Sequence, residues 1–196
     1  MIVIGVTGNI GTGKSTVCRI LSGYGAAVID ADRLGHEVYK PHTPGWQEVV
    51  DLFGKAIIKD NDEIDRKKLG DIVFASPTAL KRLNSIVHPK INDAVHEAIE
   101  SYRKNGVQVT VLEATLLIEA GWHSLVDSIW LIMTSQDIVV NRLAARGYSE
   151  EEVLSRLRTQ MPEEHKKRYA DICISNNGDL AQLEAAVKAS WQHVIQ

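Results

Sequence analysis

The sequence predicts an α/β protein in which a parallel sheet is flanked by helices. Short apolar runs rich in β-branched residues alternate along the chain with longer segments of helical periodicity. The apolar runs are continuous, as is typical of parallel strands that are covered on both faces. The chain has 196 residues, of which 44% are hydrophobic, so we expect one sizeable core.

The expected elements follow in order along the chain. The apolar runs predict strands at Ile2–Val6, Ala26–Ile29, Val107–Leu112, Ile129–Met133 and Ile172–Ile174. The periodic segments predict helices at Ser15–Tyr24, Pro89–Arg103, Ile138–Arg146 and Leu180–Val194. Pro89 suits the first turn of its helix, because an N–H group there has no partner within the helix.

Two regions interrupt this alternation. Residues 33–88 contain short helical pieces that are broken at prolines and glycines, which predicts a helical insertion that binds a substrate. Residues 136–169 are helical and rich in arginine, and Ser149 and Glu152 have the spacing of a capping box. We interpret this second region as a mobile lid.

Composition and charge exclude some partners. The formal net charge is −3, so the chain lacks the basic excess of a protein that binds nucleic acid. It begins in a strand without a basic leader, and no apolar stretch is long enough to span a bilayer, so we expect a soluble, cytoplasmic protein without a membrane partner. Cys18 and Cys173 are expected to be reduced thiols in the core.

A glycine-rich segment follows the first expected strand and precedes the first expected helix. Its sequence, GNIGTGKS from Gly8 to Ser15, matches the pattern G-x-x-x-x-G-K-[ST] of a phosphate-binding loop, the P-loop. Glycines let successive N–H groups point at phosphate oxygens near a helix N-terminus. The residues expected to bind ATP are Gly8, Gly11, Thr12, Gly13, Lys14, Ser15 and Thr16.

The chemistry of this loop requires a cation and a metal ligand. Lys14 would reach the β- and γ-phosphates, and the Ser15 hydroxyl would ligate Mg²⁺. The alternative is a glycine-rich turn that only joins strand to helix and leaves Lys14 in solvent. The pattern in its strand–loop–helix context favours a P-loop NTPase fold, with a parallel sheet flanked by helices, a helical substrate-binding insertion and a helical lid.

Carboxylates follow two further expected strands. If the chain is still extended at Asp30-Ala31-Asp32, both carboxylates point to the same side of the sheet, at the carboxyl edge where ligands of open α/β folds bind. Asp32 is the candidate catalytic base, and capping of the next helix is the alternative for both residues. Glu113 ends another strand and has either a metal-linked or a structural role.

The arginines of residues 136–169 are candidates for phosphate binding. Arg142 and Arg146 are spaced to share one face of a helix, and Arg142 is the preferred catalytic candidate because a guanidinium group neutralises charge during phosphoryl transfer. Arg156, Arg158 and Gln160 follow on the next segment. A solvated face paired with the acidic residues 150–152 is the alternative.

With these residues identified, the chain resembles the dephospho-coenzyme A kinase family along nearly its whole length. The resemblance rests on several separated motifs, namely Thr7–Val17, Gly25-Ala26, Val28–Asp32, Phe53-Gly54, Asp65-Arg66, Leu69-Gly70, Val73-Phe74, His88-Pro89, Leu116–Glu119, Arg142-Leu143, Arg146-Gly147, Arg156, Gln160, Ala170-Asp171 and Asn176–Gly178. Thr115 and Ile118 depart from the family's usual proline and phenylalanine, which leaves the details of the substrate pocket open.

The resemblance implies that ATP and Mg²⁺ are used to phosphorylate the ribose 3′-hydroxyl of dephospho-coenzyme A, the last step of coenzyme A synthesis. It also implies one domain, 1–196, with a core at about 1–32, 106–135 and 170–196, a substrate-binding insertion at about 33–105 and a lid at about 136–169. The oligomeric state is left open.

Other classes of protein share parts of this pattern. A nucleoside or nucleotide kinase would have the same loop, lid arginines and Mg²⁺ with a smaller acceptor, and the Asp-Ala-Asp segment and the pair His88-Pro89 argue for the coenzyme A precursor. A GTPase switch should carry an Asn-Lys-x-Asp motif, which this sequence lacks. A nucleotide-binding fold without catalysis remains a third alternative, against which Lys14, Ser15 and Asp32 argue.

Overall fold

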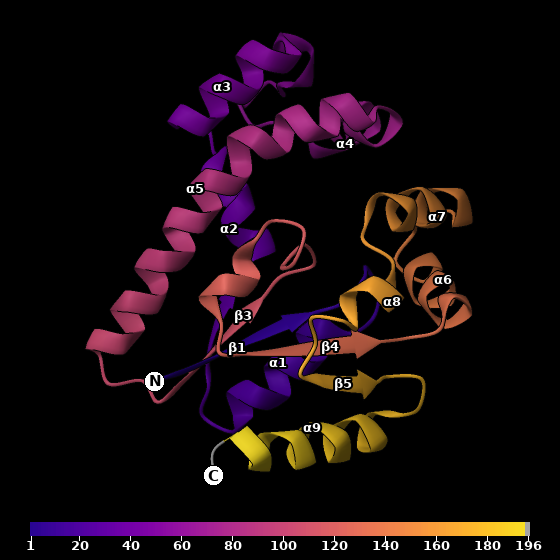
Figure 1. Cartoon of the computed structure of the whole chain (residues 1–196). Helices are drawn as coiled ribbons and strands as arrows, with labels where there is room; N and C mark the ends of the chain where they lie inside the picture. The colour runs from indigo at the N-terminus through magenta and orange to yellow at the C-terminus, as the bar shows by residue number, and fades with distance from the viewer. Residues whose placement is uncertain (195–196) are drawn as a thin grey trace. The chain divides into compact units, whose positions relative to one another are not determined.

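The computed structural model describes residues 1–194, which divide into two compact units (Figure 1). One unit, here called the sheet unit, comprises residues 1–30 and 98–194. The other, here called the helical unit, comprises Ala31–Glu97.

The sheet unit is built on a parallel five-stranded sheet of order β2-β3-β1-β4-β5. Its strands are β1 (Ile2–Thr7), β2 (Ala27–Asp30), β3 (Val109–Glu113), β4 (Ser128–Met133) and β5 (Ile172–Ser175). The predicted fold class is confirmed, and the strand bounds differ from the expected ones by at most two residues. Every residue of β3 is buried, including Thr110 and Glu113, which fits a parallel strand that is covered on both faces.

Helices α1 (Lys14–Gly23) and α9 (Leu180–Val194) pack against each other along one face of this sheet (Figure 1). Their apolar stripes, which include Val17, Leu21 and Val187, join the strand residues Val6 and Trp130 in one buried cluster. A fully buried leucine such as Leu21 contributes roughly 1.5–3 kcal/mol relative to an exposed one. This packing fixes α1, and with it the loop that precedes α1.

The rest of the sheet unit is helical. It contains the 3₁₀ helix η2 (Trp122–Leu125) and the helices α6 (Gln136–Ala144), α7 (Glu150–Thr159) and α8 (Glu163–Lys166). The capping box at the start of α7 is confirmed, with Ser149 accepting from the Glu152 N–H and Glu152 accepting from the Ser149 N–H. None of the helices described in residues 1–194 combines the length and the apolar character that a bilayer span needs.

The helical unit begins with short helices, as the sequence predicts, but from residue 77 onward it is part of a single 28-residue helix instead of further short pieces. The helices of this unit are α2 (Ala31–Val38), α3 (Pro44–Phe53), the 3₁₀ helix η1 (Lys55–Ile57), α4 (Arg66–Ala75) and the start of α5 (Pro77–Lys104). Thr43 caps α3 by accepting from the Trp46 N–H, and Asp65 caps α4 by accepting from the N–H groups of Lys67 and Lys68. Within this unit, the only strand-like pairing is an isolated bridge between residues 58 and 64.

Pro89 does not begin a helix. It lies inside α5, which starts at Pro77, so Pro77 is the residue in the first turn. An interior proline removes one helical hydrogen bond and costs about 3 kcal/mol. Burial of the apolar stripe on both sides of it, which includes Val87, Ile91 and Val95, offsets this cost and keeps the helix continuous.

The two cysteines differ in environment. Cys18 is buried in α1, as expected, but Cys173 is exposed, so the expectation of a core thiol is wrong for that residue. β5 is an edge strand, and its side chains alternate between the core, where Ile174 is buried, and solvent.

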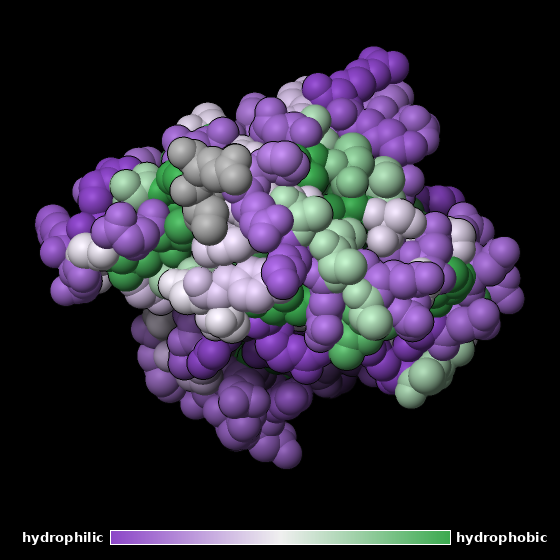
Figure 2. All heavy atoms as spheres, turned by 90° about the horizontal axis from the view of Figure 1, so that it is seen from below, coloured by the Kyte–Doolittle hydropathy of each residue, from purple (hydrophilic) through white to green (hydrophobic). Residues whose placement is uncertain are grey.

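The surface seen from the side on which α9 lies mixes hydrophilic and hydrophobic residues (Figure 2). The exposed large apolar side chains of the described residues are Tyr24, Ile72, Tyr169 and Leu180. The Tyr24 ring packs against the Trp191 ring of α9, with 5.8 Å between their centroids. Single apolar residues of this kind are normal on a protein surface.

Candidate active site

The glycine-rich loop joins the end of β1 to the start of α1, and its glycines are required by its geometry. Gly8, Gly11 and Gly13 have φ angles of 148°, 79° and 97°, a range that favours glycine. A Cβ atom on Gly8 would lie 2.4 Å from the carbonyl oxygen of Ile132. The expected strand–loop–helix arrangement is therefore present, with the backbone conformation that a phosphate-binding loop needs.

The side chains of Lys14 and Thr12 both contact the backbone of the loop at Asn9. The Thr12 hydroxyl donates to the carbonyl oxygen of Asn9 at 2.9 Å, and Lys14 Nζ contacts the same oxygen at 3.3 Å. Lys14 is only 7% exposed. This burial contradicts the alternative of a plain turn with its lysine in solvent, and it places a cation beside the N–H groups of the loop.

Side chains from distant parts of the sequence hold the loop in place. The carbonyl oxygen of Thr12 accepts from Asn176 Nδ2 at 2.7 Å and from the Thr134 hydroxyl at 3.1 Å. The Ile10 N–H donates to Gln160 Oε1 at 3.0 Å. Thr134 was not expected at the site. Its position one residue beyond β4 is the signal that could have found it, because the carboxyl ends of parallel strands meet at one edge.

Carboxylates meet the loop at this same edge of the sheet. The Ser15 hydroxyl donates to Glu113 Oε1 at 2.7 Å, and Glu113 is 7% exposed. Asp30 lies beside Glu113 in the register of β2 and β3. Burial raises the pKa of Cys18, and the adjacent Glu113 charge raises it further, so this thiol stays neutral.

These oxygens suit a hard cation. A hydroxyl and a carboxylate 2.7 Å apart supply oxygen ligands of the kind that Mg²⁺ prefers. No group of three or more His, Cys, Asp or Glu side chains within residues 1–194 is arranged to hold a metal ion by itself. The residues fit a metal that arrives with a nucleotide.

Arg142, in the last turn of α6, lies next to the loop. Its Nη2 donates to the carbonyl oxygen of Asn176 at 3.0 Å, and its Nη1 lies 3.8 Å from the position that a Cβ on Gly13 would occupy. Arg146 lies two residues beyond α6, so these two arginines do not share one helical face. Arg156 lies 5.0 Å from the centre of the Tyr148 ring, a cation–π contact within the α6–α7 region.

Asp32 is placed differently from the expectation. β2 ends at Asp30 and α2 begins at Ala31, so the chain is no longer extended and the strand alternation does not reach Asp32. Asp32 instead lies in the first turn of α2, where its carboxylate complements the helix dipole.

A buried ion pair links α8 to the loop that follows β3. Lys166 is fully buried, and its Nζ lies 3.1 Å from Glu119 Oε1 and 2.8 Å from the carbonyl oxygen of Thr115. Glu119 Oε1 also accepts from the Met161 N–H at 2.9 Å, and the Thr115 carbonyl also accepts from the Thr7 hydroxyl at 3.4 Å. The sequence interpretation did not single out Lys166, because a lysine between acidic residues is usually solvated.

The parallel strand order, the glycine-rich loop between β1 and α1, the buried lysine and the acid beside the loop serine together define a P-loop kinase. Shikimate kinase from Bacteroides thetaiotaomicron has the same fold, with a TM-score of 0.57 and 15% identity over 100% of this chain and 99% of that one.

Comparison with more similar proteins identifies the particular family. The family described as "Dephospho-CoA kinase" matches residues 2–182. A dephospho-CoA kinase from Carboxydothermus hydrogenoformans is 44% identical over 91% of this chain and 87% of its own length. A dephospho-CoA kinase structure from Campylobacter jejuni is 29% identical with a TM-score of 0.71, covering 98% of this chain and 96% of that one. The chain belongs to the dephospho-CoA kinase family.

Proposed function

We propose that this protein transfers the γ-phosphoryl group of ATP to the ribose 3′-hydroxyl of dephospho-coenzyme A, giving coenzyme A and ADP. The observation that carries the proposal is the hydrogen bond between Ser15 and the buried Glu113, which puts a carboxylate at the loop that would bind the phosphates. Membership of the dephospho-CoA kinase family supports the identity of the acceptor.

The residues of the loop would bind and neutralise the phosphates. N–H groups of Gly11–Thr16 would contact phosphate oxygens, and Lys14 and Arg142 would stabilise the charge that develops on the transferring group. Ser15 and Glu113 would hold Mg²⁺, which would supply positive charge to neutralise the phosphates during transfer. Lys14 donates to the Asn9 carbonyl and Arg142 donates to the Asn176 carbonyl, and these hydrogen bonds keep both cations beside the loop.

Asp32 is the proposed base. Asp32 lies in the first turn of α2, two residues beyond the end of β2, and a carboxylate there would suit an acceptor hydroxyl that must approach the γ-phosphorus in line. Asp32 would orient this hydroxyl and take its proton as transfer proceeds. Residues 33–105 would bind the acceptor and residues 136–169 would act as the lid. A cytoplasmic location stays a prediction from the sequence.

The test is ADP production in the presence of ATP and Mg²⁺, measured without an acceptor and with dephospho-coenzyme A, adenosine or AMP. We expect turnover with dephospho-coenzyme A and a product whose new phosphate is on the 3′-oxygen, as determined by NMR. Faster turnover with adenosine or AMP would instead identify a nucleoside or nucleotide kinase. ADP production that no acceptor stimulates would contradict the proposal.

A further inference from the structure

A cavity of about 380 Å³ lies wholly within the helical unit. It is bordered by the end of α2 and the residues after it, by the segment before α4, and by the first turn of α4. Ligand sites commonly have volumes of roughly 300–1,000 Å³. Its wall carries the cations Lys40, Lys59, Arg66 and Lys67 and the acids Glu63 and Asp65, together with the rings of His36 and Tyr39.

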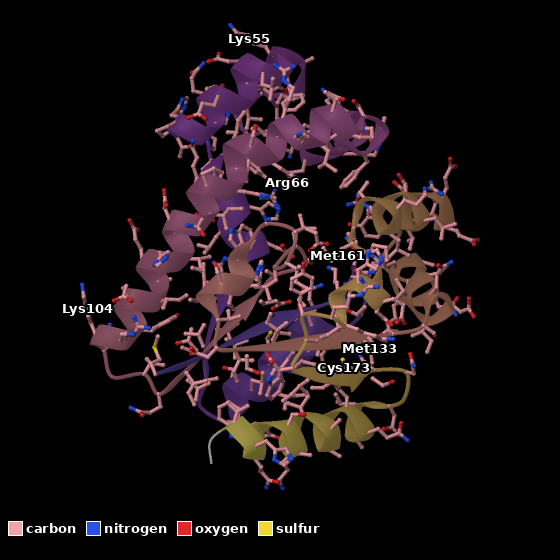
Figure 3. The ribbon with its side chains drawn as sticks, in the orientation of Figure 1. Lys55, Arg66, Lys104, Met133, Met161 and Cys173 are labelled. Carbon is pink, nitrogen blue, oxygen red and sulfur yellow. The ribbon has the colours of Figure 1, made fainter. Side chains whose placement is uncertain are left out.

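The lysines of this cavity are already paired with acids. Lys40 pairs with Glu37, Lys59 lies 3.9 Å from Glu63, and Lys67 lies 3.5 Å from Asp71. Arg66 makes no such ion pair within residues 1–194, and its side chain is exposed at the start of α4 (Figure 3). The positive charge left for a ligand is therefore concentrated on a guanidinium group, the side chain best suited to two phosphate oxygens at once.

The start of α4 cannot bind an anion through its own N–H groups. Asp65 Oδ1 accepts from the N–H groups of Lys67 and Lys68 at 3.0 and 3.2 Å. These backbone hydrogen bonds lower the pKa of Asp65, so its carboxylate is ionised and already partnered by the helix. An anion in the cavity must be held by side chains, and Arg66 is the one that remains.

Tyr39 is an uncharged residue of the cavity wall near Arg66. Burial raises the pKa of Tyr39, and the nearby Arg66 charge opposes that rise without cancelling it. The hydroxyl therefore stays protonated and can donate a hydrogen bond to a phosphate oxygen. Its ring meets the His36 ring edge-on, with 6.0 Å between their centroids.

We propose that this cavity binds the diphosphate of the acceptor, with Arg66 pairing to its oxygens and Tyr39 donating to them. The inference rests on the proposed function, because dephospho-coenzyme A carries a diphosphate between its ribose and its pantetheine arm. Adenosine lacks this diphosphate. The site would therefore bind dephospho-coenzyme A more tightly than adenosine.

The experiment compares Arg66→Met with Lys68→Met, a variant of an exposed lysine on the same helix that does not line the cavity. Dissociation constants of dephospho-coenzyme A and adenosine are measured by calorimetry with the P-loop saturated by a non-hydrolysable ATP analogue. We expect Arg66→Met to weaken binding of dephospho-coenzyme A by roughly 10- to 100-fold and to leave that of adenosine within about twofold. Lys68→Met should leave both within about twofold.

Two further variants sharpen the assignment. Arg66→Lys keeps the charge but loses the planar fork, so its loss should fall between those of wild type and Arg66→Met. Tyr39→Phe should weaken dephospho-coenzyme A binding by a few-fold, as expected for one neutral hydrogen bond. Equal losses with both ligands, or no loss with either, would overturn the proposal.

Failure of the diphosphate site can be distinguished from failure of the proposed function. If wild-type protein turned over ATP without regard to dephospho-coenzyme A, the proposed function would fail. If turnover required dephospho-coenzyme A but its affinity did not depend on Arg66, only the diphosphate site would fail.

Discussion

Lys14 combines a positive charge with near-complete burial, at 7% exposure, in the first turn of α1. A charge placed in this way is costly unless the protein uses it or pairs it. Its contact with the Asn9 carbonyl holds the ammonium group over the loop rather than in the core. At the scale of single residues, the burial of Lys14 and its contact with Asn9 distinguish a P-loop from a glycine-rich turn whose lysine lies in solvent.

Lys14→Ala should lower kcat by about three powers of ten, because it removes charge stabilisation from the transferring phosphate. Steady-state kinetics with dephospho-coenzyme A measures the loss, and thermal unfolding followed by circular dichroism checks that the fold persists. Near-normal turnover in a folded variant would remove the loop from the mechanism.

Arg142→Ala should lower kcat/KM for ATP by roughly 10- to 100-fold, because the guanidinium group beside Gly13 no longer neutralises the phosphates. The matched control is Arg146→Ala, which changes an exposed arginine just beyond the same helix and should stay within about twofold. Comparable losses in the two variants would show that net charge, and not the position of Arg142, matters.

Asp32→Asn keeps the shape of the side chain and removes its basicity. We expect kcat to fall on the order of 10²- to 10⁴-fold with little change in acceptor affinity, and Asp30→Asn to be milder. The measurement is kcat and the dissociation constant of dephospho-coenzyme A for both variants. A larger kcat loss in Asp30→Asn would transfer the role of base to Asp30, and small losses in both would leave the hydroxyl to be activated by geometry alone.

At the scale of elements, the segment from Gln160 to Lys166 is attached at three points. Gln160 binds the Ile10 N–H, Glu119 binds the Met161 N–H, and Lys166 binds Glu119 and the Thr115 carbonyl. α8 has only four residues, so helix propensity contributes little to its stability. The buried ion pair is therefore what fixes this segment against the loop after β3.

Lys166→Met should lower the free energy of unfolding by about 3 kcal/mol, because it leaves the Glu119 carboxylate without its buried partner. Glu119→Gln should cost less, since Glu119 is 20% exposed and an amide can still accept from the Met161 N–H. Urea unfolding of both single variants and the double variant measures the coupling. A double variant whose loss equals the sum of the single losses would show that the pair is not coupled.

Much of the element order follows from the sequence, and the exceptions have physical causes. The apolar runs located the strands, since a sheet covered on both faces admits few polar side chains. Local preference places proline at helix starts, so the prediction for Pro89 is wrong, because tertiary packing continues α5 through it. The contacts of Lys166 and Thr134 cannot be predicted from a local pattern, because their partners lie far away in the sequence.

At the scale of the whole molecule, the rate at which Cys18 is labelled measures how often the core of the sheet unit opens. Cys18 lies in the core cluster between the sheet and α1, and its neutral thiol reacts only when that core opens. Cys173 is exposed, so we expect it to react without any opening of the core. Substituting Cys173 by serine therefore leaves one thiol whose labelling follows the opening of the core.

ATP at about 100 times its dissociation constant should slow labelling of Cys18 roughly 100-fold in the Cys173→Ser protein, because the open form does not bind nucleotide. The rate is followed with an aromatic disulfide reagent at several ATP concentrations. A Cys18 rate that does not depend on ATP would mean that the thiol becomes accessible through a local motion that leaves the P-loop folded.

Gly13 and Asn176 compete for the same space. A Cβ atom on residue 13 would lie 2.2 Å from the Asn176 amide nitrogen, the atom that donates to the Thr12 carbonyl. A side chain at position 13 would therefore require the Asn176 amide to move. This displacement would break the hydrogen bond from the amide to the Thr12 carbonyl, which connects the loop to the end of β5. Glycine at position 13 therefore preserves this hydrogen bond as well as the positive φ angle.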